Sequence, residues 1–111
     1  MRDIVIAAAR RTAIGTFGGG LAKVPAHELG AIVIKQVLAD AGVAPDRVDE
    51  VLMGQILTAG CGQGPARQAA MAAGLPDTVP AMGLNRLCGS GLQAVIDAAR
   101  MVALGEAEVV V

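Results

Sequence analysis

The chain of 111 residues has the usual size of one domain, and its formal net charge of −1 provides no basic surface for nucleic acid. Apolar residues make up 54% of the sequence, whereas Phe17 is its only aromatic residue. We therefore expect a core of Ala, Val, Leu, Ile and Met. Without aromatic platforms on which bases could stack, DNA or RNA is not expected as a partner.

The first predicted element is a strand, because residues 4–9 form a continuous apolar run of the kind found in strands covered on both faces. This run is too short for a signal-peptide core, and Arg10 and Arg11 follow it where a cleavage site would stand. No other segment approaches the about 20 apolar residues of a membrane-spanning helix. We therefore expect a cytoplasmic protein without a membrane partner.

A glycine-rich loop over residues 12–25 leads into the first predicted helix. The apolar positions of this helix recur at helical spacing, at Leu29, Val33, Val37 and Ala41. Glu28 near the start and Gly42 just past the end are residue types that helix termini prefer.

Further strands and helices alternate along the rest of the chain. Strands are predicted over residues 48–54, 81–85 and 108–111, and a short helix over residues 66–73. The last helix follows Gly89 and ends at Gly105, with a polar face of Gln93, Asp97 and Arg100 and an apolar face of Leu92, Val95, Ile96, Ala99, Val102 and Ala103. The order β-α-β-α-β-α-β predicts an α/β fold with a mostly parallel sheet and helices on its faces.

The sequence stops inside its last predicted strand, on three consecutive valines. A finished domain seldom ends in this way, without a turn or a polar tail. We therefore expect residues 1–111 to be a fragment of a longer chain or a truncated gene product.

Cys88 is the strongest candidate for chemistry, since it stands between a predicted strand ending near Asn85 and a helix beginning near Gly89. The positive end of the helix dipole and the free backbone N–H groups favour the thiolate, which is the nucleophilic form. Gly89 and Gly91 leave room beside the sulfur for a bulky acyl donor. A buried structural thiol remains an open alternative on position alone, because free cysteine is among the most buried residue types.

Other candidate motifs point to no further site. His27, the only histidine, is predicted to be a solvated surface residue, and Cys61 a structural thiol. Residues 60–65 do not make a dinucleotide-binding turn, because Pro65 stands where the last glycine is needed. Two cysteines without a C-x-x-C spacing predict neither a metal site nor a disulfide framework, so both thiols are expected to be reduced.

Residues 85–95, Asn-Arg-Leu-Cys-Gly-Ser-Gly-Leu-Gln-Ala-Val, resemble the active-site signature of the thiolases, which are acetyl-CoA acetyltransferases and 3-ketoacyl-CoA thiolases. Residues 11–19 resemble the opening loop of this family, and residues 51–70 its second strand and the segment that follows. The likeness covers the whole chain. It places the nucleophile interpretation of Cys88 above the structural one.

The resemblance implies a ping-pong acyl transfer in which Cys88 attacks the thioester of one acyl-CoA and holds the acyl group. A second acyl-CoA, deprotonated at its α carbon, then attacks this acyl group to give a 3-ketoacyl-CoA, and the reverse direction is thiolysis. The backbone N–H of Cys88 would help to bind a thioester oxygen. Coenzyme A arrives as a substrate, so neither a resident cofactor nor a metal is implied, and a full-length relative would form a homodimer or homotetramer.

Family members are several times longer than this chain. The resemblance places the activating histidine, a second acid/base cysteine and the loop domain that grips CoA beyond Val111, and neither His27 nor Cys61 matches these groups. Residues 1–111 would thus be a partial thiolase amino-terminal domain, without the loop domain and the carboxy-terminal domain. Such a segment would hold the nucleophile but not the groups that activate it.

Three functions remain in competition. A biosynthetic acetyl-CoA acetyltransferase, which condenses two acetyl-CoA to acetoacetyl-CoA, is the leading interpretation, because residues 57–63 resemble short-chain relatives. A degradative thiolase for longer acyl chains is the near alternative. The third is a non-catalytic thiolase-like module that only associates with a partner chain.

Overall fold

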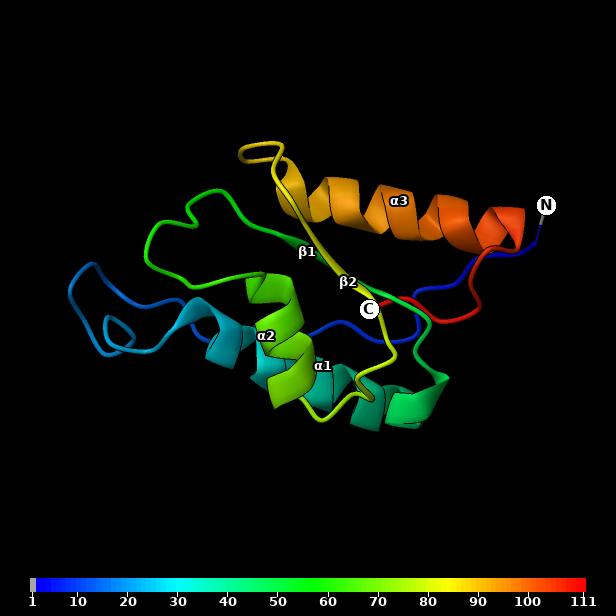
Figure 1. Cartoon of the computed structure of the whole chain (residues 1–111), viewed down its shortest axis with the longest axis horizontal. Helices are drawn as coiled ribbons and strands as arrows, with labels where there is room; N and C mark the ends of the chain where they lie inside the picture. The colour runs from blue at the N-terminus through cyan, green and yellow to red at the C-terminus, as the bar shows by residue number, and fades with distance from the viewer. Residues whose placement is uncertain (1) are drawn as a thin grey trace.

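Two short parallel strands form the centre of the computed structural model, which describes residues 2–111. The elements follow the order α1 (Ala26–Ala41), the 3-10 turn η1 (Pro45–Arg47), β1 (Val51–Gly54), α2 (Pro65–Ala72), β2 (Ala81–Leu84) and α3 (Ser90–Leu104). Val51 lies opposite Ala81, and Gly54 lies opposite Leu84. Helix α3 covers one side of this sheet, while α2 and then α1 lie on the other (Figure 1). The predicted α/β architecture with parallel pairing is confirmed.

The predicted helix ends are confirmed at both long helices. Helix α1 is followed by Gly42, whose φ of 64° closes the helix while the N–H of Val43 donates to the carbonyl of Leu38 (3.0 Å). Helix α3 is followed by Gly105, at φ 77°. Residues with a Cβ rarely adopt this left-handed conformation, which explains why glycine marks both ends.

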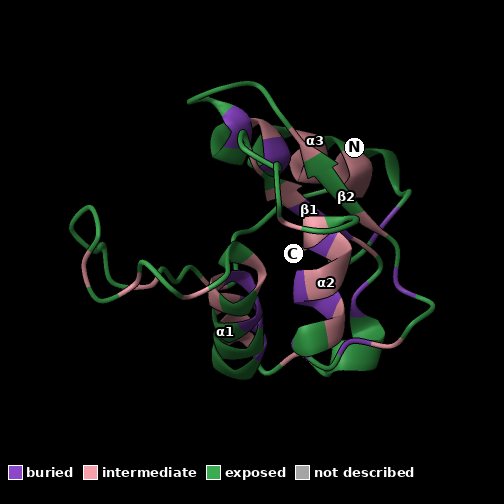
Figure 2. Ribbon diagram, turned by 60° about the vertical axis from the view of Figure 1, so that its left-hand side comes forward, coloured by how far each residue is buried: buried purple, intermediate pink, exposed green. Residues whose placement is uncertain are grey.

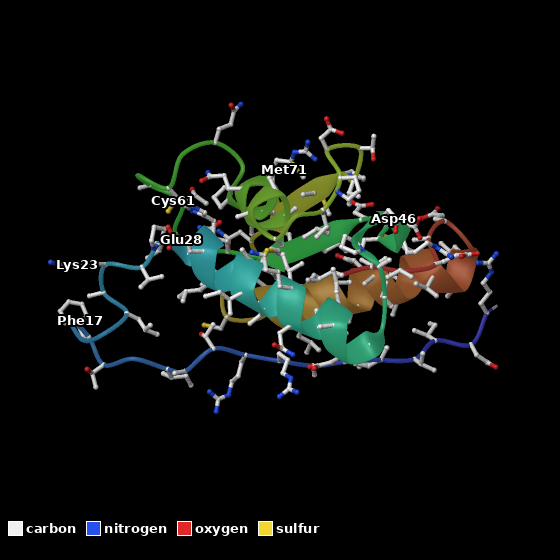
Figure 3. All side chains as sticks on the ribbon, turned by 90° about the horizontal axis from the view of Figure 1, so that it is seen from below. Phe17, Lys23, Glu28, Asp46, Cys61 and Met71 are labelled. Atoms are coloured by element: carbon white, nitrogen blue, oxygen red, sulfur yellow. The ribbon has the colours of Figure 1, made fainter. Side chains whose placement is uncertain are left out.

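The core lies between α1, α2 and β1 and contains only aliphatic side chains, as the composition predicted. Its buried members are Ala31, Ile34, Leu38, Val48, Val51, Ala69, Ala70, Ala73, Leu75 and Val79. Small residues bring the two helices close together, since a Cβ on Gly30 would lie 3.1 Å from the Cβ of Ala69. Phe17 takes no part in this core. It is fully exposed on a loop that projects away from the helices (Figure 3).

The predicted first strand is wrong for this structure. Residues 4–9 form no strand, and Val5 and Ile6 are 82% and 77% exposed. The only backbone hydrogen bond that holds this end of the described chain runs from the N–H of Arg2 to the carbonyl of Ala103 (3.4 Å). An apolar run indicates that a segment suits a buried strand, but the strand itself requires a neighbouring backbone that forms a ladder with it.

The predicted last strand is confirmed only as a short pairing with β1. Val110 forms a parallel bridge with Glu50, and the N–H of Leu52 donates to the carbonyl of Val111 (2.7 Å). Asp49 strengthens this contact, because its Oδ2 accepts hydrogen bonds from the N–H groups of Glu108 (2.6 Å) and Val109 (3.0 Å). The central strand β1 therefore has parallel neighbours on both sides.

Helix α3 contacts the sheet through small residues rather than through the apolar face that was predicted. Ser90 and Ala94 are its buried residues, whereas Leu92 and Leu104 are 68% and 70% exposed. Figure 2 shows this helix mostly in the colours of exposed and intermediate residues.

One segment of the described chain is long and apolar enough to cross a membrane, by length and composition alone. Residues 87–104 have a mean hydropathy of 1.3. The expectation that no segment comes near this limit was therefore too strict.

Candidate active site

The predicted nucleophile lies in a tight turn between β2 and α3. Strand β2 ends at Leu84, α3 begins at Ser90, and Cys88 is an exposed free thiol between them. Two backbone hydrogen bonds close the turn, from Gly89 N to Arg86 O (3.1 Å) and from Ser90 N to Leu87 O (3.0 Å). The strand–turn–helix placement of Cys88 is therefore confirmed. Within residues 2–111, Cys88 is exposed rather than buried.

The residue before the nucleophile is held in an unusual conformation. Leu87 has a φ of 50°, which makes it the only non-glycine residue with a positive φ among residues 2–111. A side chain with a Cβ pays about 1–2 kcal/mol for this left-handed conformation. Asn85 supports it locally, because its Oδ1 accepts a hydrogen bond from the N–H of Leu87 (2.9 Å). Asparagine commonly forms such a bond to the N–H two residues on, so this part of the turn could have been recognised from the sequence.

A second polar side chain binds the turn from inside. Ser90 is 5% exposed, and its Oγ accepts a hydrogen bond from the N–H of Arg86 (2.9 Å) while donating one to the carbonyl of Leu87 (2.6 Å). Directly beneath it lies Gly54, at the end of β1. A Cβ on Gly54 would lie only 2.7 Å from the Cβ of Ser90. Neither role was predicted from the sequence, because the close contact between Gly54 and Ser90 joins segments that are far apart along the chain.

The start of α3 offers backbone donors beside the thiol. Gly89 is the N-cap and provides no capping side chain, and the first helical hydrogen bond runs from Gln93 N to Gly89 O (2.9 Å). Within residues 2–111, no acceptor is paired with the N–H groups of Cys88, Gly91 and Leu92. Free N–H groups at a helix start attract negative charge, such as a thiolate or the oxyanion of a tetrahedral intermediate.

A ladder of polar side chains runs along one side of α3, half-buried at Gln93 and Asp97 and exposed at Arg100. Arg86 donates to the Oε1 of Gln93, whose Nε2 donates to the Oδ1 of Asp97 (2.8 Å). Arg100 donates to the same carboxylate oxygen (3.0 Å). The predicted polar face of this helix is thereby confirmed, and it connects to the turn through Arg86.

A hollow of about 350 Å³ opens at the carboxyl ends of β1 and β2, which is also the end of β2 from which the turn with Cys88 leaves. Asn85 lines it, together with Gln55, Thr58, Pro65, Ala81 and Gly83. This is the edge at which ligands bind in open α/β sheets. Cys88 does not line the hollow itself, but Asn85 belongs both to the hollow and to the turn.

The structure does not bring His27 or Cys61 to the nucleophile. His27 is half-buried in the first turn of α1 and lines a second, smaller hollow of about 80 Å³ beside Gln55. Cys61 is half-buried in the loop before α2, with its Sγ 3.7 Å from the carbonyl oxygen of Ala59. Within residues 2–111, no group of three His, Cys, Asp or Glu side chains could hold a metal ion.

Comparison with known proteins decides which family has this arrangement. Residues 4–111 match the sequence profile of the thiolase N-terminal domain. The chain belongs to the thiolase family. The segments that resembled this family on sequence alone are thus part of a match that covers nearly all of the chain.

Individual thiolase relatives agree with the profile. The acetyl-CoA acetyltransferase of Cupriavidus necator is 63% identical over 111 residues, which are 100% of this chain and 28% of that relative. The acetyl-CoA acetyltransferase of Pseudomonas aeruginosa is 58% identical, with the same two coverages. The cytosolic acetyl-CoA acetyltransferase of Mus musculus is 55% identical over 108 residues, which are 97% of this chain and 27% of that relative. The chain therefore spans somewhat more than a quarter of the length of these relatives.

Proposed function

We propose that this thiolase chain supplies the nucleophile of an acetyl-CoA acetyltransferase, which condenses two acetyl-CoA to acetoacetyl-CoA and CoA and also catalyses the reverse thiolysis. The observation that carries the proposal is the exposed Cys88 at the start of α3, on a turn that buried Ser90 holds. Eight relatives with 53–63% identity are named acetyl-CoA acetyltransferases, and they support the choice of reaction.

In the first half-reaction, the Cys88 thiolate attacks the carbonyl carbon of acetyl-CoA. The oxyanion that forms is stabilised by backbone N–H groups, for which the unpaired N–H of Cys88 is suited. Its collapse breaks the bond between the carbonyl carbon and the CoA sulfur, so that CoA leaves as a thiolate that takes up a proton. The acetyl group stays on Cys88.

In the second half-reaction, another acetyl-CoA loses a proton from its α carbon. The resulting carbanion attacks the acetyl carbon on Cys88, which forms the new C–C bond and releases the Cys88 thiolate. Two proton-transfer groups are needed for these steps. His27 does not fit this role, because it lines the smaller hollow beside Gln55 and not the turn that carries Cys88. We therefore expect the rest of the full-length protein to supply the two proton-transfer groups.

The same proposal covers partners and location. Coenzyme A thioesters are the substrates, and the reaction as written needs neither a resident cofactor nor a metal. We expect the full-length protein to be a homodimer or homotetramer in the cytoplasm. The naming of the Mus musculus and Rattus norvegicus relatives as cytosolic supports this location.

Acyl-group trapping tests the role of Cys88. The full-length protein is incubated with radiolabelled acetyl-CoA, and the labelled peptide is mapped. We expect label on Cys88 in the wild type, none in Cys88→Ala and very little in Cys88→Ser. Cys61→Ala is the matched control and should be labelled like the wild type. Label on Cys61, or undiminished label in Cys88→Ala, would contradict the proposal.

The two alternative functions, a degradative thiolase and a non-catalytic module, predict different results in rate measurements and in the labelling experiment. A degradative thiolase would cleave a long-chain 3-ketoacyl-CoA faster than acetoacetyl-CoA, so the ratio of these two rates distinguishes it from the short-chain enzyme. A non-catalytic module would take up no acetyl label at all.

A further inference from the structure

Ser90 stands out because the acyl transfer described above does not use it. It is the only serine in the chain, and it is the only polar or charged residue among the buried residues of the described chain. Burial of a hydroxyl is unfavourable unless the hydroxyl forms hydrogen bonds. Its Oγ forms two, and both go to the turn that carries Cys88.

One of these two bonds acts directly on Leu87, the strained residue of the turn. The carbonyl oxygen of Leu87 accepts one bond from the Ser90 Oγ (2.6 Å) and one from the Ser90 N–H (3.0 Å). Leu87 would leave its positive φ of 50° if nothing opposed the change, because an extended backbone suits a residue with a Cβ better. Any rotation about Leu87 would carry the sulfur and the N–H of Cys88 to a new place.

Contact with the sheet fixes Ser90 in turn. The end of β1 approaches so closely that a Cβ on Gly54 would lie 2.7 Å from the Cβ and the carbonyl carbon of Ser90. Val51 and Leu52, at the other end of β1, are 0% and 6% exposed, so the strand that ends at Gly54 is anchored in the core. The position of the turn is therefore defined relative to the sheet through Ser90.

We propose that Ser90 is a positioning residue, whose hydroxyl holds Leu87 in its left-handed conformation and so places the sulfur and the N–H of Cys88 for attack on a thioester. This inference rests on the proposed acyl transfer. It goes further, because it attributes the position of the Cys88 sulfur and N–H to the hydrogen bonds of one buried hydroxyl.

Ser90→Ala in the full-length protein is the direct test, with two rates measured at Cys88. Acetylation by acetyl-CoA requires correct placement of both the sulfur and the N–H, and it should fall by about tenfold to a hundredfold. Alkylation by iodoacetamide requires only an accessible thiolate, and it should change far less. A core truncation remote from the turn, Val48→Ala, controls for lost stability and should leave both rates near those of the wild type.

A rescue variant separates positioning from a general structural role. Glycine adopts a positive φ without a steric penalty, so Leu87→Gly should make the hydroxyl less necessary. We expect Leu87→Gly/Ser90→Ala to acetylate at least about threefold faster than Ser90→Ala alone, since the penalty removed is comparable to one hydrogen bond. Acetylation in Ser90→Ala at the wild-type rate, or equal losses of acetylation and alkylation, would overturn the inference, as would the absence of rescue.

An isosteric pair keeps the inference testable if Ser90→Ala does not fold. Ser90→Thr and Ser90→Val crowd Gly54 equally and differ only in the hydroxyl. The threonine variant should acetylate at least about tenfold faster than the valine variant, and equal rates would refute the role of the hydroxyl. If the wild type itself takes up no acetyl group, the proposed function fails instead, and so the two failures are distinguishable.

Discussion

Replacing Gly54 by alanine is expected to separate the sheet from the turn that holds the nucleophile. The added Cβ would lie 2.7 Å from the carbonyl carbon and the Cβ of Ser90, and 2.8 Å from the nitrogen of Gly91. Non-bonded carbon atoms rest at about 3.5–4.0 Å, so the start of α3 must move by roughly 1 Å. Two of these three atoms belong to the backbone, and they cannot rotate out of the way as a flexible side chain would.

The expected loss of stability follows from this overlap. Forcing an extra methyl group into a well-packed contact costs about 1–3 kcal/mol, which lowers the ratio of folded to unfolded protein by about fivefold to 150-fold. The same shift carries Ser90 and Cys88 with it. A misplacement of about 1 Å in an active site can lower a rate by about a hundredfold, so acetylation of Cys88 should fall as well.

Urea denaturation of the full-length protein measures the stability term, and trapping with radiolabelled acetyl-CoA measures the rate. Gly91→Ala is the matched control for stability, because a Cβ at Gly91 meets no atom within 4 Å. Alanine is favoured over glycine in a helix by about 0.5–1 kcal/mol, so this control should raise the free energy of unfolding. If the free energy of unfolding of Gly54→Ala were within about 0.5 kcal/mol of the wild-type value, the close approach of β1 and α3 would be refuted.

Two carboxylates are expected to make the stability of the chain's outer segments depend on pH. Hydrogen bonds from the backbone N–H of Val109 and of its neighbour Glu108 lower the pKa of Asp49 below its usual 3.8. Its stabilising effect is therefore complete above about pH 4 and is lost as the pH falls through the lowered pKa, and the protection of residues 106–111 against hydrogen exchange, relative to the intrinsic rate at each pH, should fall there. Asp49→Asn should abolish that pH dependence, and an unchanged profile would contradict it. The hydrogen bond from Arg10 likewise lowers the pKa of Asp40, so Asp40→Asn should raise the backbone mobility of residues 8–12 at neutral pH, measured as lower NMR order parameters, and leave residues 106–111 unaffected.

Local features could be predicted from the sequence where the physical cause is local. Both long helices end where glycine permits a left-handed residue, at Gly42 and Gly105. The position of Cys88 between a strand and a helix follows from the change of apolar period around Gly89. Each of these features depends on residues that are close together in the sequence, within one or two helical turns, so a sequence pattern can reveal it.

Features that depend on distant segments could not be predicted. Residues 4–9 have the composition of a buried strand, but no pattern within them states whether another backbone pairs with them. The contact face of α3 was missed for a related reason. The periodicity of the sequence identifies the apolar face of a helix. The sheet instead contacts the side of α3 that carries Ser90 and Ala94, where small side chains allow the closest approach.

The strain at Leu87 belongs to the same class, because an ordinary leucine carries no sign of a positive φ. Strained backbone of this kind persists only where its surroundings over-determine it, and it gathers at functional sites. Here three hydrogen bonds converge on Leu87, one from its own N–H to Asn85 and two to its carbonyl from Ser90. All three bonds are local in sequence, but Ser90 itself is held by the end of β1, which is far away along the chain. The exposed thiol thus takes its fixed position from the most deeply buried strand of the described chain.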